Sequence, residues 1–488
     1  MGRVRKPAAW TALKQHGLPD AGVYVARTNP SMKKHISMIG AGPTSLGAAY
    51  RLSQIGYEDW CIYEKDNWPG GLASSFVDEY GFTWDIGGHV QFSHYPYFDE
   101  LMDVLLEDQW FHHERESWVW LYDRFIPYPF QNNIRHLPKE AMWECVQGLV
   151  QLYQSNGRSQ PANFRDWIYA TFGDGIARHF MLPYNFKVWA YPPEGMNYVW
   201  IGDRVAIIDL NRILHNIFHE KDDVSWGPNN KFRFPRKGGT GSIWRTLADR
   251  LPDEKIKYNK RLERIETAKR RLYFADGSSE PYEILLSTMP LDLLVFSSDL
   301  DDLKPAAGLL KHSSTNLIGL GLRGSPAPSL RGKCWIYFPE KNCAFYRVTV
   351  FSHYSPHHVP DSSRYWSLML EVSESPHKPV NHTNILDEVI EGALNTNLIE
   401  SRDQVACTWT YHAPYGYPIP SLQRDEVLNV LLPALAERDI YSRGRFGAWK
   451  YEVSNQDHSA MQGVECMNNI IFGTGEITVF HPSIVNGR

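Results

Sequence analysis

The sequence predicts an α/β fold in which a parallel-sheet unit is interrupted by other regions. Near the N-terminus, a short apolar segment, a glycine-rich turn, a helical pattern and a second apolar segment follow one another. Two glycine pairs then come before residue 90, and alternating apolar residues beyond residue 300 are typical of strands. The chain therefore combines a βαβ unit with a separate region rich in strands.

The βαβ unit is predicted from its three elements and from the acid that follows them. We expect a strand at 35–39, a helix at 43–55 and a second strand at 60–63. Between strand and helix, Gly40-Ala41-Gly42 forms a turn at which backbone N–H groups can approach a pyrophosphate. Glu64 ends the second strand, where it can accept hydrogen bonds from an adenosine ribose. The unit predicts dinucleotide binding, and the alternative is a structural βαβ turn.

Two more glycine pairs extend this prediction. Gly70-Gly71 stands in "WPGGLASS", and Gly87-Gly88 leads directly to His89 in "DIGGHVQFSHY". Glycine is used where nothing larger than hydrogen fits, so three successive clusters favour a long cofactor lying against the backbone. On this interpretation Gly87 and Gly88 press against a ring system; the alternative is that both pairs are ordinary tight turns.

The remaining elements are predicted from residue spacing. Residues 110–225 have mainly helical spacing, and another helix follows "GGTGS". Asp276-Gly277 predicts a hairpin turn. Residues 315–375 alternate as strands, and "NNIIFGTGEIT" is predicted to end as an apolar strand. Two further helices are expected near 384–396 and 425–437.

Composition and charge argue against several classes of protein. The 488 residues carry a formal net charge of -5, which indicates no bulk attraction to nucleic acid or to an anionic membrane. No apolar run is long enough to span a bilayer. The six cysteines form no Cys-x-x-Cys pair, which argues against zinc and favours a reducing, cytoplasmic location. The acids at 299–302 are interpreted as a solvated cluster, so no metal is expected.

Long strings along the chain carry a resemblance to a known family. They include "GGLASS", "GGHVQFSHY", "PYPFQNNI", "PYNFKVWA", "FRFPRKGGTGSIW", "KCWIYFPEKNCAFYR", "LEVSES" and "SRGRFGAWKYEVSNQDHS". From near residue 33 onward the chain resembles the UDP-galactopyranose mutases of the fungal and protozoal type, within the amine oxidase–like flavoproteins. The resemblance implies an isomerase that interconverts UDP-galactopyranose and UDP-galactofuranose through a covalent adduct between the sugar and reduced FAD. NADPH or NADH is the implied reductant.

Element order and the resemblance together imply four parts. A tail occupies 1–32. A Rossmann-like FAD-binding domain is expected from 33–110, 226–300 and 440–488. A mainly helical domain is inserted at 111–225, and a substrate domain with a mixed or antiparallel sheet occupies 301–439.

Three side chains receive catalytic roles from the resemblance. Arg204 in "IGDRVA" and Arg347 in "FYRVTV" match arginines that hold the diphosphate, and guanidinium forks suit phosphate geometry. His89 matches a histidine beside the flavin, on a loop whose conformation follows the oxidation state of the cofactor. We expect His89 to sense reduction and to help arrange the site; the alternative is a satisfied histidine in a turn.

The same resemblance implies the contacts to substrate and cofactor. The implied substrate contacts are Phe92, Arg115, Tyr128, Gln131, Phe180, Asn185, Trp189, Asn229, Trp335, Tyr337, Tyr417, Arg445 and Tyr451. The implied cofactor contacts are Gly40, Gly42, Thr44, Glu64, Gly71, Leu72, Gly87, Gly88, Leu262, Arg445, Asn455, Gln456 and Ser459. Among the substrate contacts, the tyrosines at 337, 417 and 451 would donate hydroxyl groups to the diphosphate.

Two other functions stand beside this one. Gln91 occupies a position that is aliphatic in the family, which leaves open a mutase for another UDP-sugar. An FAD-dependent oxidoreductase of the amine oxidase type would share the fold but would not need uridine and diphosphate contacts. The oligomeric state stays open, because the region after "FSHYSP" and the C-terminus are shorter than the fungal pattern.

Overall fold

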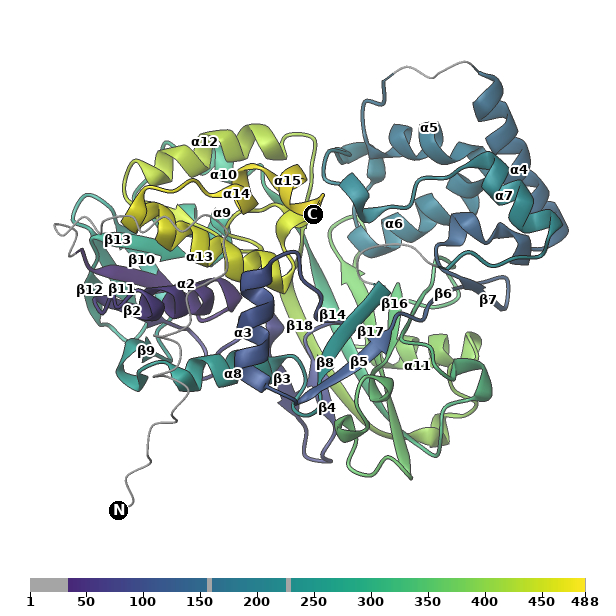
Figure 1. The fold of residues 1–488 in the computed structure, drawn as a ribbon, viewed down its shortest axis with the longest axis horizontal. Helices are drawn as coiled ribbons and strands as arrows, with labels where there is room; N and C mark the ends of the chain where they lie inside the picture. The colour runs from purple at the N-terminus through teal and green to yellow at the C-terminus, as the bar shows by residue number, and fades with distance from the viewer. Residues whose placement is uncertain (1–33, 156–159, 225–229, 488) are drawn as a thin grey trace.

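The structure is a computed structural model that describes residues 34–155, 160–224 and 230–487. The predicted tail at 1–32 and Asn229 lie outside the described residues. Among the described residues, no helix combines the length and the apolar character needed to cross a bilayer. Figure 1 shows a parallel sheet with its helices on the left, an antiparallel sheet at the centre and lower right, and a helical lobe at the upper right.

The predicted βαβ unit forms the centre of the parallel sheet. β1 (Ile36–Ile39) pairs with β2 (Trp60–Tyr63) on one side and with β13 (Ile284–Ser287) on the other, and α2 (Pro43–Gln54) connects β1 to β2. The sheet order is β19-β13-β1-β2-β9. The outer strands are β9 (Ile256–Lys257) and β19 (Ile440–Ser442). Every pairing is parallel and β1 is fully buried, as is typical of a sheet covered on both faces.

Helices cover the first face of this sheet in one apolar cluster. They are α2, α3 (Pro96–Leu106), α8 (Gly241–Arg250) and α13 (Gln456–Phe472). α2 and α13 approach closely, because a Cβ at Gly463 would lie 1.9 Å from the backbone oxygen of Thr44 and one at Gly47 would lie 2.6 Å from that of Ala460. Gly47 thus allows α2 to approach α13 closely. Ser45, two residues earlier in α2, is buried as well.

The second face packs against shorter helices and a small sheet. The helices are α9 (Leu291–Phe296), α10 (Lys304–Ala307) and α12 (Arg424–Ala436). The small sheet consists of β10 (Leu262–Glu266), β11 (Arg271–Phe274) and β12 (Ser279–Pro281). The predicted turn at Asp276-Gly277 joins β11 to β12 and is confirmed.

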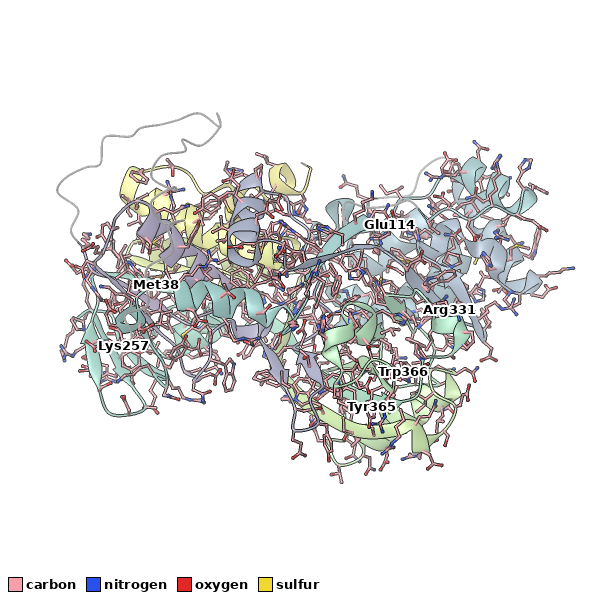
Figure 2. All side chains as sticks on the ribbon, turned by 60° about the horizontal axis from the view of Figure 1, so that its bottom comes forward. Met38, Glu114, Lys257, Arg331, Tyr365 and Trp366 are labelled. Carbon is pink, nitrogen blue, oxygen red and sulfur yellow. The ribbon has the colours of Figure 1, made fainter. Side chains whose placement is uncertain are left out.

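A seven-stranded sheet forms the second core, in the order β18-β14-β17-β16-β15-β6-β7. Its strands are β6 (Ser117–Leu121), β7 (Arg124–Pro127), β14 (Lys311–Arg323), β15 (Trp335–Tyr337), β16 (Arg347–Val350), β17 (Tyr365–Glu374) and β18 (Val405–Ile419). All pairings are antiparallel except β15 with β6. The segment that begins the predicted helical region therefore joins this sheet through β6 and β7. Figure 2 separates the two sheets, with Met38 and Lys257 in one lobe and Tyr365 and Trp366 in the other.

The helical lobe follows β7. It contains α4 (Lys139–Gln154), α5 (Phe164–Ile176), α6 (Leu182–Trp189) and α7 (Leu210–Phe218). The other elements are β3 (Ser75–Val77), β4 (Thr83–Asp85), β5 (Trp110–Glu114), β8 (Lys231–Pro235), α11 (Ile385–Asn395), α14 (Ile477–Phe480) and α15 (Pro482–Asn486). The predicted strand in "NNIIFGTGEIT" is wrong, because Asn468–Phe472 form the last part of α13.

Candidate cofactor and substrate site

Two glycine turns face each other at the start of α2. Gly40 adopts φ +92°, and the Gly70 N–H donates to the backbone oxygen of Ala41 at 2.8 Å. A Cβ built on Gly71 would lie 3.6 Å from the Cα of Gly42, whereas one built on Gly42 would meet nothing within 4 Å. α2 then begins without a side-chain cap, so N–H groups of its first turn, around the buried Thr44, remain available to an anion. The turn has the geometry of a phosphate cradle.

Glu64 holds this turn in place. Its buried carboxylate accepts the Ala41 N–H at 2.6 Å and the Asp66 N–H at 2.9 Å, and burial raises its pKa. Each carboxylate oxygen keeps a lone pair that can accept a further hydrogen bond. Leu72 and Leu262 pack against the apolar cluster on the second face of the parallel sheet.

The start of α13 presents polar groups of its own. Asn455 occupies the N-cap position without a side-chain cap, and the Oε1 of Gln456 accepts the Trp244 indole N–H at 2.7 Å. The Nε2 of Gln456 is buried without a hydrogen-bond partner among the described residues. Ser459 is buried one turn further along α13. An unpaired buried amide is costly, so this helix start suits a polar ligand edge.

The loop after β4 ends in His89. Gly87 adopts φ +101°, and the Gly88 N–H donates to Glu371 Oε1 at 3.0 Å. A Cβ on Gly88 would lie 2.8 Å from Thr349 Oγ1, so only glycine fits there. Burial, with Arg445 nearby, lowers the pKa of His89 to about 4, and its Nδ1 has no partner within the described part of the chain. The loop thus presents a neutral imidazole with one free nitrogen.

Three arginines converge near this loop from different elements. Arg204 donates to the backbone oxygen of Glu452 and lies over the Tyr451 ring, with its Cζ 5.3 Å from the ring centroid. Arg445 donates to the Gly416 backbone oxygen at 2.8 Å. In the ranges that the structure describes, neither of these two has a carboxylate within ion-pair distance. Arg347, in contrast, forms a two-pronged pair with Glu371 at 2.8 and 2.9 Å, and this pair raises its pKa. Two uncompensated guanidinium groups favour an anionic ligand.

Aromatic side chains surround the arginines. Tyr337 contacts both Tyr128 and Tyr184, with ring centroids 5.3 and 5.2 Å apart. Trp189 contacts Tyr417 and Tyr451 at 5.5 and 4.8 Å. The structure therefore brings the predicted aromatic residues from α6, β15, β18 and the segment before α13 into one cluster.

Other predicted residues have partners of their own at the edge of this cluster. Phe180 stacks on Tyr184 at 5.1 Å, Arg115 lies over Tyr128 at 5.5 Å, and the Trp335 indole donates to the Tyr337 hydroxyl at 2.6 Å. The amides of Gln131 and Asn185 donate to the backbone oxygens of Ala206 and Met181, and Phe92 packs edge-on against His94. These contacts join Phe180, Arg115 and Trp335 to the aromatic cluster, whereas Gln131, Asn185 and Phe92 have their partners elsewhere.

Comparison with known proteins connects this geometry to a family. Residues 46–360 match the family of flavin containing amine oxidoreductases. A crystal structure of reduced UDP-galactopyranose mutase superposes with a TM-score of 0.91 and 47% sequence identity, over 93% of this chain and 98% of that one. The chain belongs to the UDP-galactopyranose mutases, within the flavin containing amine oxidoreductases.

More distant structures share only the fold. A fatty acid isomerase from P. acnes matches at a TM-score of 0.60 and 16% identity, over 92% of this chain and 99% of that one. A putrescine oxidase matches at a TM-score of 0.59 and 14% identity, over 90% of this chain and 99% of that one. The fold thus serves several reactions, and the site distinguishes them.

The flavin of the mutase family fits the residues present. The open side of Gly42 and the uncapped starts of α2 and α13 suit its phosphates and polar edges. The unpartnered Gln456 Nε2 and His89 Nδ1 provide buried groups that a ring edge can satisfy. Among the predicted cofactor residues, the glycine turn with Glu64 lies at the start of α2, and Asn455 and Gln456 lie at the start of α13.

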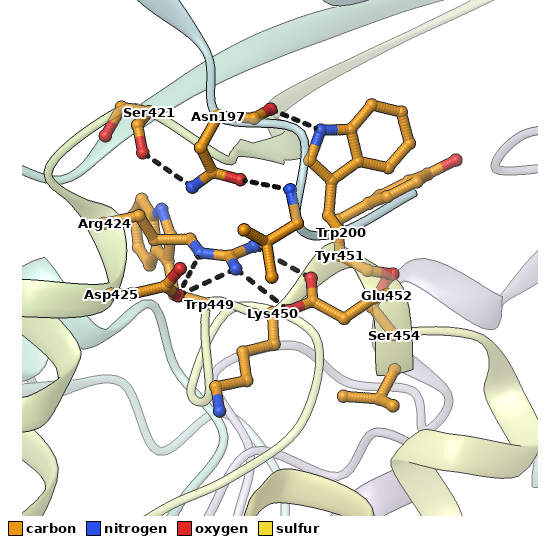
Figure 3. Close-up of polar contacts among 12 residues, drawn as sticks. Asn197, Trp200, Ser421, Arg424, Asp425, Trp449, Lys450, Tyr451, Glu452 and Ser454 are labelled. Atoms are coloured by element: carbon orange, nitrogen blue, oxygen red, sulfur yellow. Dashed lines mark hydrogen bonds and ion pairs between the residues drawn. The ribbon is translucent and has the colours of Figure 1, made fainter. Parts of the chain in front are cut away.

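Four further residues lie among these contacts and were not expected from the sequence. Tyr184 and Tyr346 extend the aromatic cluster, and Glu371 pairs with Arg347. Glu452 lies under Tyr451 and accepts a two-pronged contact from the buried Arg424 at 2.8 and 2.9 Å. Figure 3 shows Arg424 between Asp425 and Glu452, with Tyr451 on the adjoining turn. For Glu371 a signal existed, since it is an acid inside the apolar run "SLMLEVS".

We predict that Glu452→Ala destabilises the protein by roughly 3–5 kcal/mol, because it leaves Arg424 buried without its main partner. The measurement is denaturant unfolding of the flavin-loaded protein. The matched control is Glu391→Ala, which breaks an exposed pair with Arg402 and should leave the stability nearly unchanged. Equal losses in the two variants would contradict the prediction.

Proposed function

We propose that this protein is a flavin-dependent mutase that interconverts UDP-galactopyranose and UDP-galactofuranose. The observation that carries the proposal is the group of arginines beside the flavin-side loop, two of which lack a carboxylate partner among the described residues. Such a site attracts a diphosphate and repels a protonated amine. It therefore favours a nucleotide-sugar substrate over the amine expected of the oxidoreductase alternative.

Reduced FAD, held by the starts of α2 and α13 and by the loop at Gly88, would supply a nitrogen nucleophile for the anomeric carbon. Arg204 and Arg347 would donate hydrogen bonds to the departing diphosphate, and Arg204, which has no carboxylate partner among the described residues, would offset its charge. Burial raises the pKa values of Tyr337 and Tyr417, so both remain protonated hydroxyl donors at neutral pH. Tyr451, stacked under Arg204, is the third donor. These groups hold UDP near the sugar until it returns.

The uridine is assigned to the aromatic side of the cluster. Tyr128 offers a stacking face, and Phe180 provides an apolar wall. We assign the uracil and ribose contacts to Gln131, Asn185 and Trp189 on the strength of the family resemblance. Asn229 is assigned to the sugar side on the same basis.

Finer features are also proposed. The strings quoted from the sequence support the fungal and protozoal type, with NADPH or NADH as reductant. All six cysteines are free and buried, which supports a reducing, cytoplasmic location. Segments 33–110, 226–300 and 440–488 are proposed as the FAD-binding domain, since strands from all three form the parallel sheet.

The test of the proposed function is conversion by purified, flavin-loaded protein. Incubated with UDP-galactofuranose, dithionite-reduced protein should yield UDP-galactopyranose, whereas oxidised protein should yield none, because only the reduced flavin is nucleophilic. Chromatography of the nucleotide sugars measures both. No conversion with the flavin bound and reduced would contradict the proposal and direct the assay to other UDP-sugars and then to amines.

Replacing either diphosphate arginine by alanine should lower kcat by about 100- to 1000-fold, because a charge-stabilising group of the transition state is lost. Lysine at the same positions keeps the charge but not the fork, so Arg204→Lys and Arg347→Lys should recover only part of the rate. Steady-state kinetics of the reduced protein measure this. Arg402→Ala, at an exposed pair, is the control and should keep full activity.

His89→Ala should lower turnover of the reduced protein by about tenfold, the equivalent of one lost hydrogen bond. In the unmodified protein the pKa of His89 is lowered to about 4, so its imidazole is already neutral at pH 6. The kcat/KM of the reduced protein should therefore show no His89-dependent break between pH 6 and 8. Unchanged turnover in His89→Ala would show that this histidine only fills a turn.

A further inference from the structure

Glu371 links the two halves of the site. We propose that it is a positioning residue that couples flavin reduction to UDP binding, by holding the loop at Gly88 and the guanidinium of Arg347 on one carboxylate. The inference rests on the proposed function, because it assigns the diphosphate to Arg347. Glu371 has no role among the residues expected from the sequence.

The contacts of Glu371 carry the proposal. Its side chain is 2% exposed and lies on β17, directly opposite Arg347 of β16. Oε1 accepts both the Gly88 N–H at 3.0 Å and the Arg347 Nε–H at 2.9 Å. Oε2 accepts the Arg347 Nη2–H at 2.8 Å and the Tyr346 hydroxyl at 2.5 Å. Four donors thus fill the four acceptor positions of the carboxylate.

Because Glu371 Oε1 accepts from both Gly88 and Arg347, a movement of the loop changes the hydrogen bonding of the oxygen that also holds the arginine. If the peptide at Gly88 turns away, a buried charge loses a donor, and Arg347 must compensate for it. A side chain would not fit at this position, since a Cβ on Gly88 would lie 2.8 Å from Thr349 Oγ1 and 3.3 Å from Glu371 Oε1. A change in the loop is therefore transmitted to the guanidinium that faces the diphosphate.

The link extends to a second residue of the diphosphate side. The Tyr346 hydroxyl lies 3.4 Å from the hydroxyl of Tyr417 while it donates to Glu371. On the other side of the link lies His89, the residue after Gly88, whose pKa burial lowers, with Glu371 raising it and Arg347 lowering it. The carboxylate thus lies between the group next to the flavin and two groups that we assign to the diphosphate.

Coupling between two ligands is reciprocal, so it can be measured from either side. The quantity is the ratio of the UDP dissociation constants of oxidised and dithionite-reduced protein. Couplings of this kind are typically about 5- to 150-fold. In Glu371→Gln the ratio should fall by about tenfold, and the shift in flavin midpoint potential caused by UDP should shrink by about 30 mV for a two-electron couple.

The test compares flavin-loaded wild type with three variants, using UDP titration in both oxidation states. Glu371→Gln removes the negative charge of the carboxylate. Tyr346→Phe removes only the hydroxyl that donates to it, so this variant should lower the ratio of UDP dissociation constants by a smaller factor. Glu374→Gln is the control, because Glu374 lies on the same strand but bonds Asn316 and His382 instead. The control should keep the wild-type ratio. A purely structural role of Glu371 would weaken UDP binding equally in both states and leave the ratio unchanged.

The outcomes separate this inference from the proposed function. If wild type binds no UDP in either state, the proposed function is wrong. If wild type binds UDP with a ratio near one, or if Glu371→Gln keeps the wild-type ratio, only the coupling role is wrong. Should Glu371→Gln fail to bind flavin, Tyr346→Phe decides, and an unchanged ratio in that variant overturns the inference.

Discussion

Buried carboxylates that accept hydrogen bonds from backbone turns hold the site together. Glu64 holds the glycine turn before α2, and Asp85 accepts the backbone N–H of Thr240, which fixes the turn before α8. Glu371 does the same for the loop at Gly88. A buried charge is tolerated only when it is fully bonded, so each carboxylate restricts its turn to one conformation. These three carboxylates therefore hold the turns before α2 and α8 and the loop at Gly88 in place.

The need to pair buried charges also determines which arginines of the site remain without a carboxylate partner. Arg347 is neutralised by Glu371, whereas Arg204 and Arg445 bond to backbone oxygens and a hydroxyl. Before substrate arrives, the site therefore carries an excess of positive charge among its described residues. A diphosphate can compensate this excess in an aromatic, partly buried environment where electrostatic interactions are strong. An amine would increase it, which explains how one flavoprotein fold can serve such different substrates.

The residue pattern was sufficient to predict the elements whose formation depends mainly on their own residues. The bounds of α2, β2 and α11 follow from spacing and turn residues within one or two positions. β18 was not predicted, because two prolines and a glycine interrupt its alternation and only pairing with β14 makes it a strand. The end of α13 was read as a strand, since a short apolar run has the same appearance in both structures. Tertiary packing decided these cases.

The site was less predictable than the fold for the same reason. Its residues could be assigned through long family strings, but their connections could not, since Gly88 and Glu371 are 283 positions apart. Even so, an acid within a buried strand is a physical signal in itself. Alternation places Glu371 on the same face as the apolar Met369, so the charge requires partners from another element. A search for such partners among the arginines and exposed N–H groups of the glycine loops would have led to Arg347 and Gly88.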